Sequence, residues 1–131
     1  MKNNSTTKVL ITGGAGFIGS NFVRYFLDKH LAAGVVNLYK LTYSGNLGNL
    51  AGLEDKPNYK FIKGDICDQD HVEKIMKGVD AVIHFAAESH VDNSIKGPKP
   101  FIDTNIGGTF SMLEAARTYY KELAPEDRAN F

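Results

Sequence analysis

Short apolar runs alternate along the chain with segments whose apolar residues recur at helical spacing. Four runs are typical of buried strands, and they cover residues 8–12, 35–38, 59–63 and 81–85. Three segments are typical of helices: one begins at Phe17 and stops before Gly34, one is capped by Asp68 or Asp70, and one spans about residues 100–119. Polar stretches at residues 40–50 and 88–100 predict loops.

This order of elements predicts a parallel sheet with right-handed crossovers, the Rossmann-type doubly wound α/β class. A full sheet of that class has about six strands, so the runs seen here predict an incomplete one. Residues 1–7 are polar and are expected to form a disordered lead-in, and residues 8–131 are expected to form one domain. The last helix carries apolar residues on one side: Phe101, Ile102, Ile106, Phe110, Leu113 and Ala116.

Three glycines spaced three apart follow the first strand and open the first helix, in ITGGAGFIGS (residues 11–20). Gly13 permits a tight turn, Gly16 lets the backbone approach a pyrophosphate, and Gly19 lets the helix pack closely. The amide groups and positive end of that helix then suit a phosphate. A structural turn without a ligand accounts for one glycine but not for three in this register. The pattern therefore predicts a dinucleotide site.

The composition narrows the expected partners. The 131 residues include fifteen basic and fifteen acidic side chains, and this balance favours neither nucleic acid nor an anionic membrane. Cys67 is the only cysteine, so neither an internal disulfide nor a thiolate metal site is expected. No apolar stretch is long enough for a membrane helix, and the N-terminus has no signal-peptide pattern. A cytoplasmic protein without a bound metal is expected.

Three stretches carry a resemblance to a known family. TGGAGFIGSNFVRYFL (residues 12–27) resembles the extended short-chain dehydrogenase/reductase family. KLTYSGNLGNL (residues 40–50) and HFAAESHVDNSI (residues 84–95) are similar to the dTDP-glucose 4,6-dehydratases within that family. The resemblance covers residues 8 to about 119 and implies an NAD-dependent lyase that makes a 4-keto-6-deoxy sugar nucleotide for deoxysugar synthesis. Two alternatives stay open: a non-catalytic dinucleotide-binding module, and a related sugar-nucleotide epimerase or decarboxylase.

The resemblance also implies which residues contact NAD and the sugar nucleotide. Asp65 would accept the adenine amine, and the backbone of Ile66 would meet a ring nitrogen. Ser89 would reach the sugar nucleotide as well, with His90 beside it, while His84 is expected to be a packed strand residue. The expected NAD contacts are Gly13, Gly16, Phe17, Ile18, Gly19, Tyr39, Lys40, Leu41, Thr42, Asp65, Ile66, Phe85, Ala86, Ala87, Glu88, Ser89 and Thr104.

Tyr39 departs from the family pattern, which has aspartate at this position to hold the adenosine ribose. The position lies about 20 residues past the glycines, where an acidic residue accepts hydrogen bonds from the ribose hydroxyls. Losing a hydrogen bond to a charged acceptor costs roughly 1.5–3 kcal/mol, so NAD affinity is expected to be about 10-fold lower or more. Without the carboxylate, and with Lys40 alongside, NADP is a minor alternative.

No catalytic residue is assigned. The family's Tyr-x-x-x-Lys pair would lie on a later helix, and its Thr-Asp-Glu group on a later strand. Two spacings mimic the pair, Tyr25 with Lys29 and Tyr59 with Lys63, but they fall in the first helix and the third strand and are chance matches. The chain is therefore expected to be the truncated N-terminal NAD-binding part of a longer, homodimeric enzyme, and to be inactive by itself.

Overall fold

The computed structural model describes residues 7–41 and 46–131, in which four parallel strands form a sheet. The strands are β1 (Lys8–Thr12), β2 (Gly34–Tyr39), β3 (Tyr59–Lys63) and β4 (Ala81–His84), in the order β3-β2-β1-β4 across the sheet. This confirms the fold class expected from the sequence. Because the chain runs from β1 outward to β3 and returns to β4 on the other side of β1, the topological switch point lies between β1 and β4.

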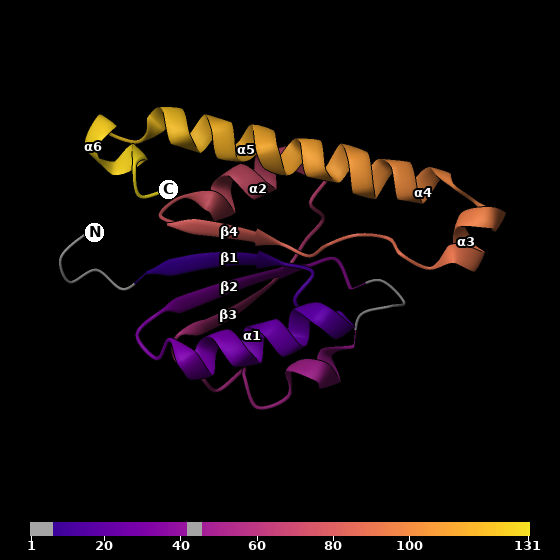
Figure 1. Ribbon diagram of the computed structural model, residues 1–131, viewed down its shortest axis with the longest axis horizontal. Helices are drawn as coiled ribbons and strands as arrows, with labels where there is room; N and C mark the ends of the chain where they lie inside the picture. The colour runs from indigo at the N-terminus through magenta and orange to yellow at the C-terminus, as the bar shows by residue number, and fades with distance from the viewer. Residues whose placement is uncertain (1–6, 42–45) are drawn as a thin grey trace.

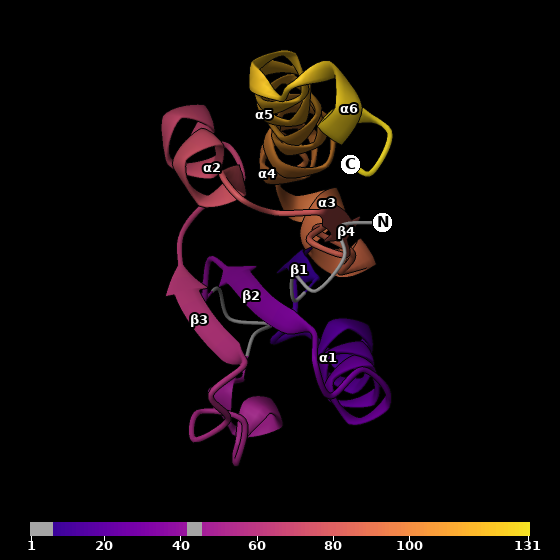
Figure 2. The same ribbon diagram turned by 90° about the vertical axis from the view of Figure 1, so that its left-hand side faces the viewer.

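Helices cover both faces of this sheet (Figures 1 and 2). One face carries α1 (Phe17–Lys29) and the short 3₁₀ turn η1 (Leu47–Leu50), and the other carries α2 (Gln69–Met76) and α5 (Thr109–Glu122). Beyond the carboxyl ends of the strands lies α3 (Val91–Lys96). A single long helix is built from α4 (Lys99–Phe101), the π-helical η2 (Ile102–Gly108) and α5, and α6 (Pro125–Arg128) follows it.

Each face of the sheet has its own apolar core, because successive side chains of a strand point to opposite faces. On β1, fully buried Ile11 belongs to the cluster that contains Leu27 of α1. Its neighbour Leu10 belongs to the cluster that contains Met76 of α2 and Met112 of α5. The apolar run of β1 is therefore continuous in sequence because both of its sides are buried.

The long helix turns its apolar side away from the sheet. Ile102, Ile106, Phe110 and Leu113 are each between 55% and 65% exposed. The side that packs against α2 instead carries residues that are buried and mostly small: Ser111, Met112 and Ala115. Small side chains let two helices approach closely, so the helix packs through this side and leaves a row of large apolar residues outside.

Two expected loops contain helical turns. The loop expected over residues 40–50 includes η1, which begins where the Asn46 side chain accepts a hydrogen bond from the Gly48 amide at 2.8 Å. The loop expected over residues 88–100 includes α3 and the start of α4. No residue of α3 is buried, and its one apolar pair, Val91 and Ile95, is too short a pattern to predict a helix. Residues 1–6 of the expected lead-in, and Thr42, lie outside the described residues.

Candidate functional site

The turn between β1 and α1 lies directly against the segment that leaves β4. Gly13 has φ +75°, and a Cβ at this position would lie 2.6 Å from the backbone nitrogen of Ala86. Both the backbone conformation and the lack of space therefore require glycine. A Cβ at Gly19 would overlap the Gly13 carbonyl group, whereas one at Gly16 would lie 3.3 Å from the same oxygen. Gly13 is thus required by its contact with the segment after β4, and Gly19 by its contact with the Gly13 carbonyl group within the turn.

Gly14 is equally constrained, although the three-residue spacing does not include it. A Cβ there would overlap the side-chain amide of Asn37. Asn37 is fully buried, and its amide donates a hydrogen bond to the Tyr59 hydroxyl at 3.0 Å. Burial raises the pKa of Tyr59, with the bond from Asn37 opposing this effect. The signals for this contact were the Gly-Gly pair and a polar residue inside an apolar strand.

The N-terminus of α1 begins at this glycine turn and has no side-chain cap. Its N-cap residue is Gly16, and no acidic residue lies in its first turn. The side chains of Phe17 and Ile18 are exposed rather than packed in the core. The first amides of an α-helix have no partner within the helix, and together with the helix dipole they attract an anion. This end of α1 can therefore hold a phosphate through the backbone.

A cleft follows the carboxyl ends of the strands in two adjoining parts, which share Tyr39, Ala86 and Ala87. The part beside α1 is also lined by Gly13, Gly16, Phe17, Ile18, Gly19, Phe85, Ser89 and His90. The part beside η2 is also lined by Lys40, Gly64, Asp65, Ile66, Glu88 and Thr104. The structure thus brings together the expected site residues from five separate segments. Gly64 was not expected, and Leu41, with φ 57°, is not among the described lining residues.

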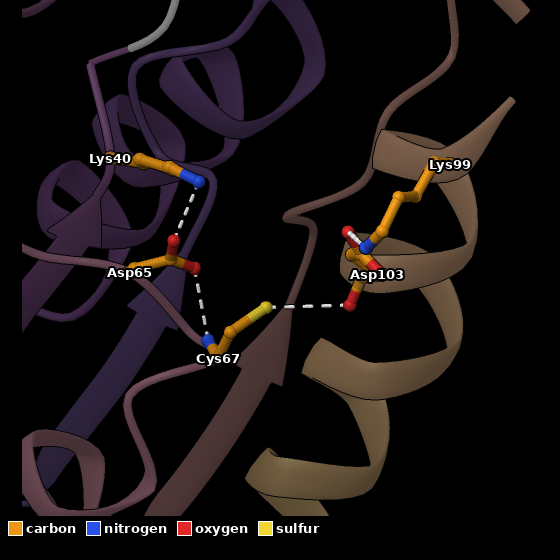
Figure 3. A network of polar contacts seen from close by, with 5 residues as sticks. All are labelled: Lys40, Asp65, Cys67, Lys99 and Asp103. Carbon is orange, nitrogen blue, oxygen red and sulfur yellow. Dashed lines mark hydrogen bonds and ion pairs between the residues drawn. The ribbon is translucent and has the colours of Figure 1, made fainter. Parts of the chain in front are cut away.

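Charged groups meet in the part of the cleft beside η2 (Figure 3). The Lys40 ammonium lies 2.6 Å from one Asp65 oxygen, and the other oxygen accepts the Cys67 amide at 3.0 Å. Burial raises the pKa of Asp65, but the bonds from Lys40 and Cys67 outweigh it, so this pKa lies below its usual value. The hydrogen bond to Asp65 raises the pKa of Lys40. Both groups are therefore charged at neutral pH.

The Cys67 thiol is the third member of this network. It donates a hydrogen bond to the Asp103 carbonyl of η2 at 3.3 Å. Burial raises the pKa of the Cys67 thiol, and Asp65 raises it further. Cys67 therefore joins the loop after β3 to the long helix, and its raised pKa disfavours the thiolate form.

One wall of the cleft is the segment Ala86–Glu88, which leaves β4. It is held by Asn105, a residue that the motifs did not single out. The Asn105 side chain of η2 accepts a hydrogen bond from the Glu88 amide at 2.7 Å and donates one to the Glu88 carbonyl at 2.9 Å. His84, which was expected to be packed, contacts Thr12 and Thr109 through its two ring nitrogens. An asparagine in the middle of a helix gave no signal, because its partner is a backbone segment 17 residues away.

The described residues contain no group of three or more acidic, histidine or cysteine side chains that could hold a metal ion. Within residues 7–41 and 46–131, no helix is both long enough and apolar enough to cross a membrane.

Open parallel α/β sheets bind ligands beyond the carboxyl ends of their strands at the switch point, and this cleft lies there. The chain is therefore a Rossmann-type nucleotide-binding fold. It belongs to the GDP-mannose 4,6 dehydratase family, whose model matches residues 10–129.

The chain is also similar to named proteins. The chain is 50% identical over 126 residues to dTDP-glucose 4,6-dehydratase of Salmonella typhimurium, covering 95% of this chain and 35% of the relative. It is 55% identical over 108 residues to the low-salt glycan biosynthesis protein Agl12 of Haloferax volcanii, covering 82% of this chain and 34% of the relative. The chain thus spans about a third of the length of these curated relatives.

Solved structures match the fold. The dTDP-glucose 4,6-dehydratase DesIV of Streptomyces venezuelae, with NAD and TYD bound, superposes with a TM-score of 0.83 at 46% identity, over 86% of this chain and 36% of DesIV. UDP-glucose 4-epimerase of Brucella ovis in complex with NAD superposes with a TM-score of 0.74 at 33% identity, over 87% of this chain and 33% of the epimerase. The same fold thus carries both reactions in related enzymes.

Replacing Lys40 with methionine should raise the pKa of Asp65, because the favourable bond from the ammonium is lost while burial of the carboxylate remains. In the native chain the lowered pKa stabilises the fold above about pH 4, and this contribution is lost as the pH falls below that value and through the lowered pKa. NMR titration of the Asp65 carboxyl carbon measures the change. Lys60→Met, on β3, is the matched control and should leave Asp65 unaffected. An unchanged pKa in Lys40→Met would show that the ion pair does not form.

Proposed function

We propose that residues 8–131 bind NAD along this cleft, as the coenzyme-binding part of a dTDP-glucose 4,6-dehydratase. The observation that carries the proposal is the uncapped N-terminus of α1 behind a turn that only glycine can form. In such an enzyme NAD supplies the acceptor for a hydride from the sugar. The contribution of this chain is to bind and orient the coenzyme, chiefly through backbone groups.

Each part of the cleft suits a different part of the coenzyme. The backbone around Gly16 and the first turn of α1 would hold the diphosphate, because no side chain stands between the phosphates and the amides. At the other end, Asp65 would accept the adenine amine. Its two oxygens each use one lone pair, on Lys40 and on the Cys67 amide, and a carboxylate has about four acceptor sites. Asp65 therefore keeps free acceptor capacity for the adenine.

The small side chains of Ala86 and Ala87 leave room for the coenzyme where the two parts of the cleft join. Ser89 and His90 lie exposed at the end beside α1, where they would meet the sugar nucleotide. No catalytic residue is proposed among these residues. Neither Tyr25 with Lys29 nor Tyr59 with Lys63 lines the cleft in the described part of the chain.

Two observations favour NAD over NADP and a dehydratase over an epimerase. The Asp65 carboxylate offsets the charge of the Lys40 ammonium and weakens its attraction for the 2′-phosphate of NADP, so NAD is the better candidate. An epimerase shares the fold at lower identity than the dehydratases do. The dehydratase is therefore the reaction that we propose, with dTDP-glucose as the substrate.

Titration of the chain with NAD by calorimetry tests this proposal. Binding should be lost or weakened by more than about 10-fold in Gly19→Ala, because a Cβ overlaps the Gly13 carbonyl and displaces the turn that holds the diphosphate. Gly97→Ala is the matched control, since a Cβ at Gly97 meets no atom within 4 Å, and it should bind like the native chain. A native chain that binds no NAD, or equal affinity in Gly19→Ala, would contradict the proposed site.

Tyr39→Asp should bind NAD about 10-fold more tightly than the native chain, because the carboxylate can accept two ribose hydroxyls. It should also bind NADP more weakly, because two negative groups then face each other. Tyr39→Phe removes only the phenol oxygen and should change NAD affinity little. Calorimetry with both coenzymes measures these effects. Equal or weaker NAD binding in Tyr39→Asp would show that the tyrosine makes its own contact with the adenosine.

We also propose that the protein forms a homodimer through the outer side of η2 and α5. The support is the row of exposed apolar residues Ile106, Phe110 and Leu113, because a continuous apolar strip of this kind is typical of an interface.

Sedimentation velocity of the chain should show a dimer that Leu113→Glu converts to a monomer, because a carboxylate cannot be buried there without a partner. The control Leu31→Glu, at a leucine that is 80% exposed just after α1, should leave the dimer intact. A native chain that stays monomeric at all concentrations would refute the dimer.

A further inference from the structure

A chain of hydrogen bonds joins the end of β1 to the long helix through His84. The Ala86 amide donates to the Thr12 hydroxyl at 3.3 Å, and that hydroxyl lies 2.6 Å from Nδ1 of His84. On the other side of the ring, Nε2 of His84 lies 3.3 Å from the Thr109 hydroxyl. The Thr109 hydroxyl in turn donates to the Asn105 carbonyl at 2.7 Å. Five residues from β1, the end of β4 and the long helix are thus linked in one series.

The series ends at the segment Ala86–Glu88, which is the wall of the cleft. The side chain of Asn105 holds both the amide and the carbonyl of Glu88. The short segment from Ala86 to Glu88 is therefore fixed at one end through Thr12 and His84 and at the other end through Asn105. That segment lines both parts of the cleft, so its position determines the width of the space beside the glycine turn.

The neutral ring with its proton on Nε2 satisfies every member of the series. Thr109 already donates to Asn105, so its oxygen accepts from a protonated Nε2. A hydroxyl has one proton and two lone pairs, so Thr12 can accept from the Ala86 amide and donate its own proton to an unprotonated Nδ1. A second proton, on Nδ1, would occupy the other lone pair of the Thr12 oxygen and leave the Thr12 proton without Nδ1 as its acceptor.

The surroundings of the ring also disfavour its charged form. His84 is half-buried, and burial is the cause that lowers its pKa, with no charged side chain contributing. The groups that face the ring are the neutral hydroxyls of Thr12 on β1 and Thr109 on α5. No carboxylate within the described residues is positioned to compensate a positive charge on this ring. Geometry and electrostatics thus agree on the same state.

We propose that neutral His84 is a positioning residue that holds the Ala86–Glu88 wall in the form that accepts the coenzyme. The proposal rests on the proposed NAD site, because the wall matters only if the coenzyme lies against it. Burial lowers the pKa of His84 below that of a free imidazole, so NAD affinity should be highest near neutral pH and above and should fall only as the pH drops through this lowered pKa, below about 6.5. The affinity falls at low pH because a second proton, on Nδ1 of His84, disturbs the hydrogen bonds that hold the Ala86–Glu88 wall in the form that binds the coenzyme.

Nitrogen-15 NMR of the imidazole in the coenzyme-free chain is the first test, and it does not depend on NAD binding. The neutral tautomer with the proton on Nε2 is expected at pH 7. A proton on Nδ1, or a charged ring at that pH, would overturn the proposal.

Amide hydrogen exchange in the coenzyme-free chain is the second test. Thr109→Val removes the hydroxyl with little change in shape, and exchange at the Glu88 and Ala86 amides should become about three- to tenfold faster. Thr118→Val on the same helix is the matched control and should leave both rates unchanged. His84→Gln keeps a neutral donor in place of Nε2, and it should restore protection at Glu88 relative to His84→Phe. Unchanged rates in Thr109→Val and His84→Phe would overturn the proposal.

Calorimetry with NAD at pH 5.5, 6.5 and 8 completes the experiment. The native chain should lose affinity at the lowest pH, and His84→Gln should lose this pH dependence because it cannot titrate in that range. The same pH dependence in His84→Gln would overturn the proposal. A chain with the expected tautomer and exchange rates that binds no NAD at any pH would instead contradict the proposed function.

Discussion

The site depends on the close approach of the first turn to the segment that leaves β4. At Gly13 the distance to the Ala86 backbone leaves no space for a side chain. This contact brings together two segments that are more than 70 residues apart and sets the N-terminus of α1 beside the wall of the cleft. The sheet makes the approach possible, because β1 pairs directly with β4 and their carboxyl ends lie at the same edge.

The two parts of the cleft would attract a ligand through different chemical groups. Beside α1 the attraction comes from backbone amides and the helix dipole, which need glycines and no charged side chain. Beside η2 it comes from the pair Lys40–Asp65, whose charges are fixed by their mutual bond. A ligand with a diphosphate at one end and a hydrogen-bonding ring at the other matches this division. The proposed phosphate site therefore requires no net positive charge on the chain.

The long helix contributes to two surfaces, the wall of the cleft and the outer apolar side. Toward the sheet it presents small residues and the polar side chains of Asn105 and Thr109, which hold the wall of the cleft. Outward it presents large apolar residues that are more than half exposed. Its π-helical segment η2 carries Thr104 and Asn105, and π-helical turns are frequent at functional sites. The residues that hold the wall of the cleft and those of the proposed interface are therefore on one long helix.

The sequence by itself determined the strands, the parallel order, and most of the residues that line the cleft. Strands buried on both faces have continuous apolar runs, and the glycine turn has a short-range pattern, so both are visible without coordinates. The tertiary structure alone decided the roles of Gly14, Asn37, Asn105 and His84, because each depends on a partner distant in the chain. It also decided which side of the long helix is buried, since helical periodicity shows an apolar side but not what that side faces.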